Sequence, residues 1–471
     1  MNHDLTSTIC AIATPIGRGG LGIVRLSGVS AIEIADRVFR GSDRIRLNQA
    51  SGYTVHYGHA HDPEDGTAID EVLATVFRAP HSYTGEDMVE FSTHGGPVVM
   101  RRILGVMMTE GAQMAQPGEF TMRAFLNGRI DLTEAEAVTD LIDAKTDEAA
   151  AAALAQLQGV LHEEVIALRA ELVAALARLE MGIDFTEEDL PPEELATVVN
   201  RLRRVEERID HLLLGYQRGR VLRDGFVVVL AGPPNVGKST LFNRLAQDER
   251  AIVTDIPGTT RDVLREYINL DGWPLCLVDT AGIREATDLV EKIGIERSEG
   301  AIRAADGAIW LIDGDLDWEV QKPPEAFREL AQLPWLIAVN KLDQITDPKA
   351  AVGDVASQHA PTFKTIPSVV GISALTGEGV DALVNVIKGW IADCGAADQS
   401  AQIAINDRHR TALIRAKDSA AQALQAIVAD HAPELAAFEA RNAAVALGEI
   451  IGETTTEDIL SEVFANFCIG K

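Results

Sequence analysis

Cysteine is scarce in this sequence, with only four among 471 residues and no paired spacing between them. The four are Cys10, Cys276, Cys394 and Cys468. This scarcity fits a reducing compartment better than a disulfide framework. The sequence also lacks a basic-then-apolar opening segment and any run of about 18 apolar residues that would cross a bilayer. We therefore expect a cytoplasmic protein that does not associate with a membrane.

Basic residues are also few, since 42 Lys and Arg stand against 71 Asp and Glu and give a net charge of −29. The summed field of such a chain repels phosphate backbones at long range. Any nucleic-acid contact must therefore be local or shared with a partner. At 471 residues the chain is too long for one compact core, and ordinary domain sizes predict roughly three domains.

The first part of the sequence mixes strand-like and turn-like segments. Residues 1–130 combine short β-like runs, such as 22–26 and 71–77, with glycine-rich turns, which predicts an α+β domain. From residue 132 the composition changes to Ala, Glu and Leu, and apolar residues recur every three or four positions over 154–179. This period predicts one long helix. After a segment rich in acidic residues and proline, a second helix is expected over 193–216.

Strand-like apolar runs alternate with helical stretches from residue 226 to about 385. The expected strands are 226–230, 275–278, 308–312, 335–339 and 368–372. This alternation predicts a parallel sheet covered by helices. Residues 400–465 return to helix, and each helical flank alone would leave an apolar stripe uncovered. We therefore expect an α/β domain inserted into a helical domain that is built from both flanks.

The predicted domains follow from these changes in composition and apolar periodicity. They are an N-terminal α+β domain over 1–130, a first helical part over 131–220, an inserted α/β domain over 221–385 and a second helical part over 386–471.

A phosphate-binding loop follows the expected strand 226–230. The run from Gly232 to Thr240 matches G-x-x-x-x-G-K-[ST] between a strand and a helix that is expected to begin near Leu241. Glycines let backbone N–H groups point at phosphates, Lys238 neutralises the β- and γ-phosphates, and the Ser239 hydroxyl ligates Mg²⁺. The predicted nucleotide contacts of this loop are Asn235, Val236, Gly237, Lys238, Ser239 and Thr240.

A guanine-recognising motif follows the expected strand 335–339. Its residues are Asn340, Lys341 and Asp343. A carboxylate at Asp343 accepts two hydrogen bonds from the N1 hydrogen and the exocyclic amine of guanine, and adenine offers no such pair of donors. Ser373, Ala374 and Leu375, after the last strand, are expected to support the base through backbone N–H groups. The chain is therefore predicted to be a GTPase with GTP as its substrate.

Two switch segments lie between these motifs. Asp279, Thr280, Ala281 and Gly282 follow an apolar strand, so that Asp279 is placed to hold the magnesium shell and the Gly282 N–H to sense the γ-phosphate. Thr260, in the earlier segment, is the second hydroxyl expected on Mg²⁺. Where small GTPases carry a water-orienting glutamine this chain has Ile283, so another group must act. From spacing alone the candidates are Arg284, Glu285, Asp288, Glu291 or a monovalent cation held by Asn235 and by carbonyl oxygens of the first switch.

The whole chain resembles the MnmE (TrmE) family of tRNA modification GTPases. The resemblance is carried by T-D-I-P-G-T-T-R-D in the first switch, the closing C-I-G-K and the first-domain motifs Y-T-G-E-D, H-G-G-P, P-G-E-F and R-A-F-L-N-G. It implies a dimerising N-terminal domain that binds folate, a two-part helical domain and an inserted Ras-like P-loop GTPase domain.

The resemblance also implies site residues. A 5,10-methylene- or 5-formyl-tetrahydrofolate would contact Arg25, Glu90, Arg129 and Lys471. A K⁺ ion would be held by Asn235, Thr254, Ile256 and Thr259 in place of an arginine finger once two GTPase domains meet, and Glu291 would orient the attacking water. The nucleotide contacts of the first switch would be Thr254, Asp255, Ile256, Pro257, Gly258, Thr259 and Thr260, and Cys468 would take part in catalysis.

The implied activity is wobble-uridine modification. As a homodimer in a heterotetramer with an FAD-dependent protein, the chain would help to add an aminomethyl-type group to C5 of that uridine in certain tRNAs. A GTP-switched RNA-binding or ribosome-assembly module is the alternative, and it would leave the first domain and residues 468–471 without a use. An ATPase is disfavoured by Asp343.

Overall fold

The structure is a computed structural model in which two compact units are distinguished, Met1–Thr139 with Leu447–Lys471, and Asp140–Ala446. It describes residues 6–42, 45–184, 192–248, 265–279, 305–323, 333–359, 368–396, 403–429, 433–454, 457–465, 467 and 469–470. The C-terminal residues thus belong with the N-terminal domain, while the helical and α/β parts form one unit. The domain boundaries near 130, 220 and 385 stay predictions.

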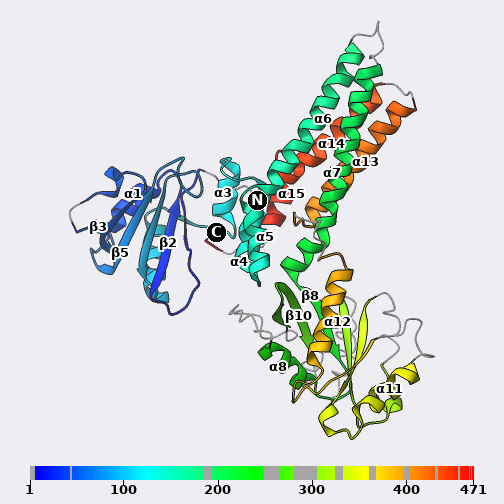
Figure 1. Cartoon of the computed structure of the whole chain (residues 1–471). Helices are drawn as coiled ribbons and strands as arrows, with labels where there is room; N and C mark the ends of the chain where they lie inside the picture. The colour runs from blue at the N-terminus through cyan, green and yellow to red at the C-terminus, as the bar shows by residue number, and fades with distance from the viewer. Residues whose placement is uncertain are drawn as a thin grey trace, which may run out of the picture. The chain divides into compact units, whose positions relative to one another are not determined.

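The first unit is built on a seven-stranded sheet with the order β3-β4-β5-β6-β2-β1-β7 (Figure 1). Its elements are β1 (Ile9–Ile12), β2 (Leu21–Ser27), α1 (Ala31–Val38), β3 (Phe39–Gly41), β4 (Thr54–His61), β5 (Ala68–Phe77), β6 (Met88–His94), α2 (Pro97–Thr109), β7 (Gln113–Met114), α3 (Glu119–Leu126), α4 (Leu132–Asp143) and α15 (Glu457–Ala465). Only β1 and β7 pair in parallel among these strands.

Alternation along β2 divides the sheet of the first unit into two faces. Val24 and Leu26 are fully buried and pack in the core beneath α1 and α2, so Arg25 between them projects from the opposite face. In the antiparallel pairing of β2 with β6, Arg25 lies directly opposite Glu90. Two polar residues separated by 65 positions in sequence are thereby brought together on one side of the sheet.

The last residues of the chain pack on the same unit. Phe464 and Phe467 join Met122 and Leu132 in a small apolar cluster. Ile469 forms an isolated β-bridge with Pro117. Gly470 has a φ of 96°, and a Cβ there would lie 2.6 Å from the Ile12 carbonyl oxygen, so only glycine fits this close approach.

The second unit contains an antiparallel arrangement of long helices, α6, α7, α13 and α14 (Figure 1). The helices are α5 (Asp147–Leu157), α6 (Val160–Asp184), α7 (Pro192–Asp224), α13 (Asp407–Val428) and α14 (Pro433–Ile451). Lys417 of α13 pairs with Asp210 of α7 at 2.5 Å, and Arg169 of α6 donates to the Ala444 carbonyl of α14. Both sequence flanks therefore build one helical domain, as predicted.

The expected single helix over 154–179 is wrong. The chain forms two helices, α5 and α6, because Gly159 adopts a φ of 87° between them. A left-handed residue ends the first helix, and the 3.6-residue period resumes in the second.

The α/β part is a six-stranded sheet with the order β13-β12-β11-β8-β10-β9. Its elements are β8 (Phe226–Ala231), α8 (Lys238–Asp248), β9 (Arg265–Leu270), β10 (Trp273–Asp279), β11 (Gly307–Asp313), β12 (Trp335–Asn340), α11 (Pro348–His359), β13 (Ser368–Gly371) and α12 (Val380–Asp393). All five expected strands are present, and α8 begins three residues before the expected start. The sheet is not wholly parallel, since the unpredicted edge strand β9 runs antiparallel to β10.

Candidate functional site

The loop after β8 folds around the ammonium group of Lys238. Gly232 has a φ of 154°, and a Cβ there would overlap the Leu311 carbonyl oxygen. Lys238 is 8% exposed, and its Nζ donates to the carbonyl oxygens of Gly232 at 3.0 Å and Pro233 at 2.6 Å. The charge is thus held at the centre of the loop, where it meets a phosphate group.

The positions next to Lys238 have the backbone geometry of a phosphate cradle. Asn235 and Gly237 adopt φ values of 61° and 99°. Ser239 and Thr240 are exposed in the first turn of α8, where hydroxyl groups and the helix N-terminus suit an anionic ligand. Val236 is buried beneath the loop. The arrangement fits a Mg²⁺-bound triphosphate, with Ser239 as the residue to hold the metal.

Asn340 joins three separate motifs. Its side chain is almost fully buried and donates from Nδ2 to the Val236 carbonyl at 2.7 Å. Its Oδ1 accepts from the Ala374 N–H at 2.9 Å. The phosphate loop, the strand end and the segment after β13 are therefore fixed to one another through one amide group.

Asp343 stands at the end of this assembly with an exposed side chain. Ser373 Oγ donates to Asp343 Oδ1 at 2.5 Å, and the Thr376 N–H donates to the same hydroxyl at 3.1 Å. These bonds orient the carboxylate while it stays open to a ligand. Ala374 and the exposed Leu375 come directly after Ser373 in the sequence. The structure therefore brings together every described residue of the predicted base site.

Sequence reasoning missed three residues that support this site. Asp313, at the end of β11, pairs with Lys341 Nζ at 2.6 Å, and buried Gln321 bonds the Asp313 backbone. Arg244 of α8 donates to the carbonyl oxygens of Ala374 and Leu375. Only Asp313 had a usable signal, because it directly follows a buried strand at the same sheet edge as Asn340.

The two switch segments are described only in part. Asp279 ends β10 beside Leu230 of β8, which places its backbone at the same sheet edge as the phosphate loop. The following predicted site residues lie outside the described residues: Thr254, Asp255, Ile256, Pro257, Gly258, Thr259, Thr260, Thr280, Ala281, Gly282, Glu291, Cys468 and Lys471.

A second polar cluster lies on the open face of the first unit. Arg25 Nη2 donates to Glu90 Oε1 at 2.8 Å, and Nη1 donates to the Gly470 carbonyl oxygen at 3.0 Å. The two side chains are 13% and 19% exposed, so the pair is partly shielded from water. Two predicted folate contacts and the residue before Lys471 therefore meet at one place.

Tyr83 connects this cluster to Arg129. The guanidinium carbons of Arg25 and Arg129 lie 6.0 and 5.6 Å from the centre of the Tyr83 ring, within the range of cation–π attraction. Arg129 Nη1 also donates to the Tyr83 carbonyl at 3.0 Å. Burial raises the pKa of the Tyr83 phenol, a shift that its bond to Thr121 and the two arginines oppose. The motif Y-T-G-E-D pointed to this segment but not to the tyrosine.

The sheet order, the phosphate loop and the Asp343 carboxylate define the inserted part as a Ras-like P-loop GTPase domain. Two family profiles match the chain, "MnmE helical domain" over residues 132–468 and "GTP-binding protein TrmE N-terminus" over residues 8–129. The chain belongs to the MnmE family of tRNA modification GTPases, and it is an enzyme that binds and hydrolyses GTP.

Similar curated proteins extend over the full chain. The tRNA modification GTPase MnmE of Symbiobacterium thermophilum is 44% identical and the alignment covers 98% of this chain and 99% of the relative. That of Geobacillus kaustophilus is 42% identical, with coverage of 98% and 99%. Among solved structures, Era of Aquifex aeolicus is 25% identical with a TM-score of 0.26 over 41% of this chain and 65% of that chain. The FeoB G-domain of Methanococcus jannaschii is 22% identical with a TM-score of 0.26 over 36% of this chain and 98% of that chain.

Within the described residues, none of the helices combines the length and the apolar character that crossing a membrane requires.

Proposed function

We propose that this chain, as a cytoplasmic homodimer, works with an FAD-dependent partner in a heterotetramer that modifies C5 of the wobble uridine in certain tRNAs. The group added is of the aminomethyl or carboxymethylaminomethyl type, and the one-carbon donor is 5,10-methylene- or 5-formyl-tetrahydrofolate. The observation that carries the proposal is the meeting of Arg25, Glu90 and Gly470 in the first unit. A GTP switch without folate chemistry has no use for that cluster.

The Arg25 cluster has the chemistry that a reduced folate needs. A reduced pterin carries a ring N–H beside an exocyclic amine, and one carboxylate such as that of Glu90 accepts from both. The glutamyl tail of a folate is anionic, and the guanidinium groups of Arg25 and Arg129 complement it. Arg25 Nε is buried and has no acceptor among the described residues, so a donor remains for a ligand.

The residues of the GTPase domain divide the work of phosphoryl transfer. Lys238 neutralises the phosphates, the hydroxyl of Ser239 would hold Mg²⁺, and Asp343 selects guanine. Bound Mg²⁺ supplies charge neutralisation at the β- and γ-phosphates. We assign the orientation of the attacking water to Glu291, because Ile283 has no hydrogen-bonding group.

Potassium is proposed as the cation that completes this site when two GTPase domains meet. Asn235 is exposed at the mouth of the loop with a left-handed backbone, which leaves its side-chain oxygen available to a cation. The other proposed ligands are oxygens of Thr254, Ile256 and Thr259. A cation there would offset charge that develops between the β- and γ-phosphates, as an arginine finger does.

Hydrolysis is therefore expected to be at least about tenfold faster in K⁺ than in Na⁺ at equal ionic strength, a modest part of the effect of an arginine finger. Phosphate release under single-turnover conditions measures it. Asn235→Ala should abolish the preference for K⁺ while a fluorescent GTP analogue still binds. Equal rates of the unaltered protein in the two salts would contradict the proposal.

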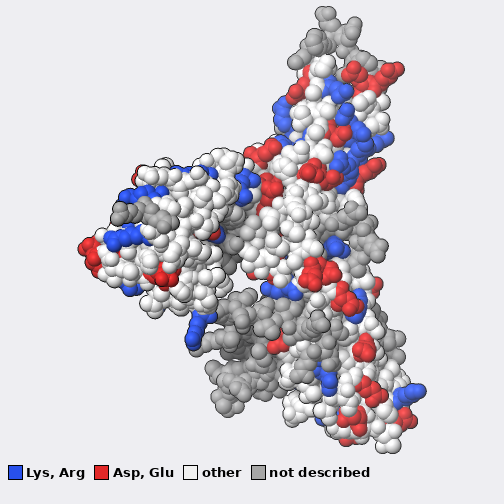
Figure 2. Space-filling view, turned by 60° about the vertical axis from the view of Figure 1, so that its left-hand side comes forward, with Lys and Arg blue, Asp and Glu red and all other residues white. Residues whose placement is uncertain are grey.

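The proposed tRNA contact is shared with the partner. Figure 2 shows Lys and Arg interspersed with Asp and Glu along the helices on the face that it presents, rather than one continuous basic surface among the coloured residues. Three arginines of α7, Arg201, Arg204 and Arg208, are each paired with an acid of α6. Two carboxylates, Glu171 and Glu164, offset most of the charge of these three arginines. Arginines paired in this way release few counterions from RNA, so much of the affinity must come from elsewhere.

The test of the proposed function is the modification itself. Wobble-uridine nucleosides of tRNA from cells that lack this gene are measured by mass spectrometry after the cells receive the unaltered gene, Arg25→Ala or Arg37→Ala. Arg37 pairs with Glu110 elsewhere in the same unit and is the matched control. We expect modification with the unaltered and the control gene and its loss with Arg25→Ala. Full modification in cells without the gene would refute the proposal.

The alternative, a GTP-switched RNA-binding or ribosome-assembly module, is separated from this proposal by ligand binding. Calorimetric titration with 5-formyl-tetrahydrofolate should give saturable heat with the unaltered protein. A flat titration, together with unaltered tRNA, would favour the alternative.

A further inference from the structure

We propose that Arg123, Glu86 and Glu119 form an ion-pair network, centred on the buried Arg123 guanidinium, that positions Tyr83 and Arg129 for binding of a reduced folate. This positioning role rests on the proposed function and assigns residues outside the cluster of Arg25, Glu90 and Gly470. The three residues come from Y-T-G-E-D, P-G-E-F and R-A-F-L-N-G, motifs for which the GTPase site has no use.

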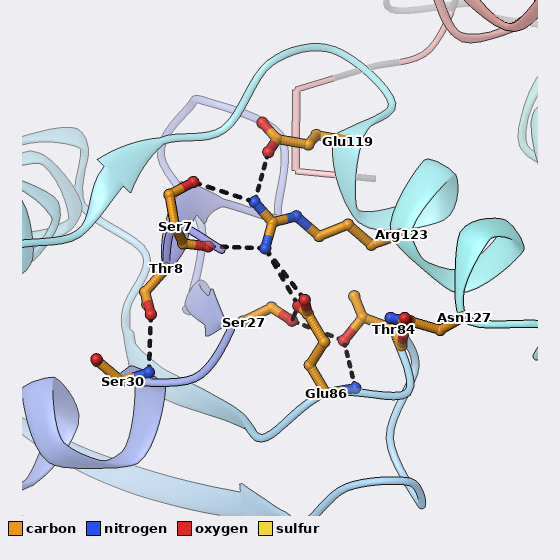
Figure 3. A network of polar contacts seen from close by, with 9 residues as sticks. All are labelled: Ser7, Thr8, Ser27, Ser30, Thr84, Glu86, Glu119, Arg123 and Asn127. Atoms are coloured by element: carbon orange, nitrogen blue, oxygen red, sulfur yellow. Dashed lines mark hydrogen bonds and ion pairs between the residues drawn. The ribbon is translucent and has the colours of Figure 1, made fainter. Parts of the chain in front are cut away.

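Arg123 is the centre of the network, as Figure 3 shows. It is 1% exposed and is the largest fully buried side chain of the described residues. Its Nη1 donates to Glu86 Oε1 at 3.2 Å and to the Ser7 carbonyl at 2.8 Å. Its Nη2 donates to Glu119 Oε1 at 2.8 Å. One planar group thus joins the segment before β1, the loop before β6 and the first turn of α3.

Glu86 extends the network to β2. Ser27 Oγ donates to Glu86 Oε2 at 2.6 Å and lies 2.6 Å from the Thr84 hydroxyl (Figure 3). Ser27 and Arg25 are two residues apart on one strand, so both project from the open face of the sheet. The network and the Arg25 cluster therefore share one strand as their common base.

The same network reaches Thr84, next to Tyr83, and Asn127, two residues before Arg129. The Thr84 carbonyl accepts from Asn127 Nδ2 at 2.7 Å, which ties the Tyr83 loop to the end of α3 (Figure 3). Arg129 follows two residues later and bonds the Tyr83 carbonyl. The Tyr83 ring, which both guanidinium groups face, is thus held by bonds that lead back to Arg123 and Glu86.

The charge balance favours positioning over simple stabilisation. Two carboxylates share one guanidinium that is 1% exposed, and their own side chains are only 18% and 10% exposed. Removing these charges from most of their water carries a desolvation penalty that apolar residues of similar size would avoid. Because this desolvation penalty makes the network a poor source of stability, we expect it to serve another role. It contacts the segments that carry Tyr83 and Arg129, so that role is to fix the geometry of these two residues.

The experiment measures 5-formyl-tetrahydrofolate binding to the full-length protein by calorimetry. Arg123→Met and Glu86→Gln should each raise the dissociation constant about tenfold with binding stoichiometry close to that of the unaltered protein, and Arg123→Lys should recover part of the loss. A purely structural role would instead lower the stoichiometry, because part of the sample would be unfolded, and leave the dissociation constant of the remainder unchanged.

Arg46→Met is the matched control, since Arg46 pairs with the buried carboxylate of Asp36 in the same unit without touching the Tyr83 loop. Its dissociation constant should stay within twofold. If Arg123→Met does not fold, Glu86→Gln and Arg123→Lys decide. A dissociation constant unchanged in those variants overturns the positioning role alone, whereas the absence of binding by the unaltered protein overturns the proposed function and this role with it.

Discussion

Single side chains decide which nucleotide this protein accepts. Asp343 is oriented by Ser373 and open to a ligand. Asp343→Asn replaces one acceptor with a donor, and xanthine presents the complementary acceptor in place of the guanine amine. Charge-assisted hydrogen bonds contribute about 1.5–3 kcal/mol each, so GTP affinity should fall roughly a hundredfold or more while XTP affinity rises.

Competition against a fluorescent GTP analogue measures both affinities. Asp354→Asn changes an exposed carboxylate on α11 in the same way and serves as the control. GTP selectivity that survives Asp343→Asn would remove Asp343 from its assigned role.

Cys10, unlike the open Asp343 carboxylate, has a side chain that burial makes unreactive. The thiol is fully buried in β1, and burial raises its pKa to about 12. At pH 8 its thiolate fraction is then roughly a thousandfold below that of an ordinary cysteine, and alkylation should be slower by at least that factor. Because the folded pKa lies above the unfolded value of 9.0, the stability contribution is complete below pH 9 and falls as pH rises toward 12.

Iodoacetamide labelling followed by peptide mass spectrometry tests this expectation, with the urea-unfolded protein as the reference for full reactivity. Labelling of Cys10 in the folded protein at the unfolded rate would show that the thiol is accessible.

At the scale of elements, α7 depends on two glycines. A Cβ at Gly215 would overlap the Ile403 carbonyl oxygen, and one at Gly219 would lie 2.5 Å from that of Ile405. The helix can thus lie directly on the chain that returns from the GTPase domain. Gly215→Ala should destabilise the second unit by about 1–3 kcal/mol, because neither backbone can yield without moving the other.

Gly389→Ala in α12 is the matched control, since a Cβ there meets no atom within 4 Å. That change should add about 0.5–1 kcal/mol, the usual gain from replacing glycine inside a helix. Urea unfolding followed by tryptophan fluorescence compares the two variants. A stabilised Gly215→Ala variant would contradict the close approach.

The elements also show what the sequence can and cannot predict. Strand β8, Lys238 and α8 are neighbours in sequence, so the phosphate loop could be placed from local pattern alone. Strand β9 was missed because Arg265–Leu270 is a half-polar edge strand with no continuous apolar run. The pairing of Arg25 with Glu90 depends on the register of β2 against β6, which residue types do not encode. The resemblance named these residues, and only the fold gives the physical reason.

At the scale of the whole molecule, the tryptophans, which are its fluorescent probes, are distributed unequally between the two units. All five tryptophans, Trp273, Trp310, Trp318, Trp335 and Trp390, lie in the second unit. A non-hydrolysable GTP analogue at a hundredfold excess over its dissociation constant should stabilise that unit by about 2.7 kcal/mol and raise the fluorescence-detected melting temperature by a few degrees.

Under the proposed function, 5-formyl-tetrahydrofolate should leave the fluorescence transition in place and shift a second transition seen only by far-ultraviolet circular dichroism. Coincident shifts of both signals with either ligand would show that the two units unfold together.

The pairing of α7 with α13 has a further consequence during synthesis. Asp210 and Lys417 are 207 positions apart, so at roughly 5–20 residues per second about 10 to 40 s pass on the ribosome between the two halves of this contact. For that interval the nascent α6 and α7 have an apolar stripe that nothing downstream yet covers. The inserted domain emerges complete within the same interval, and it is therefore expected to fold before the bundle that carries it can close.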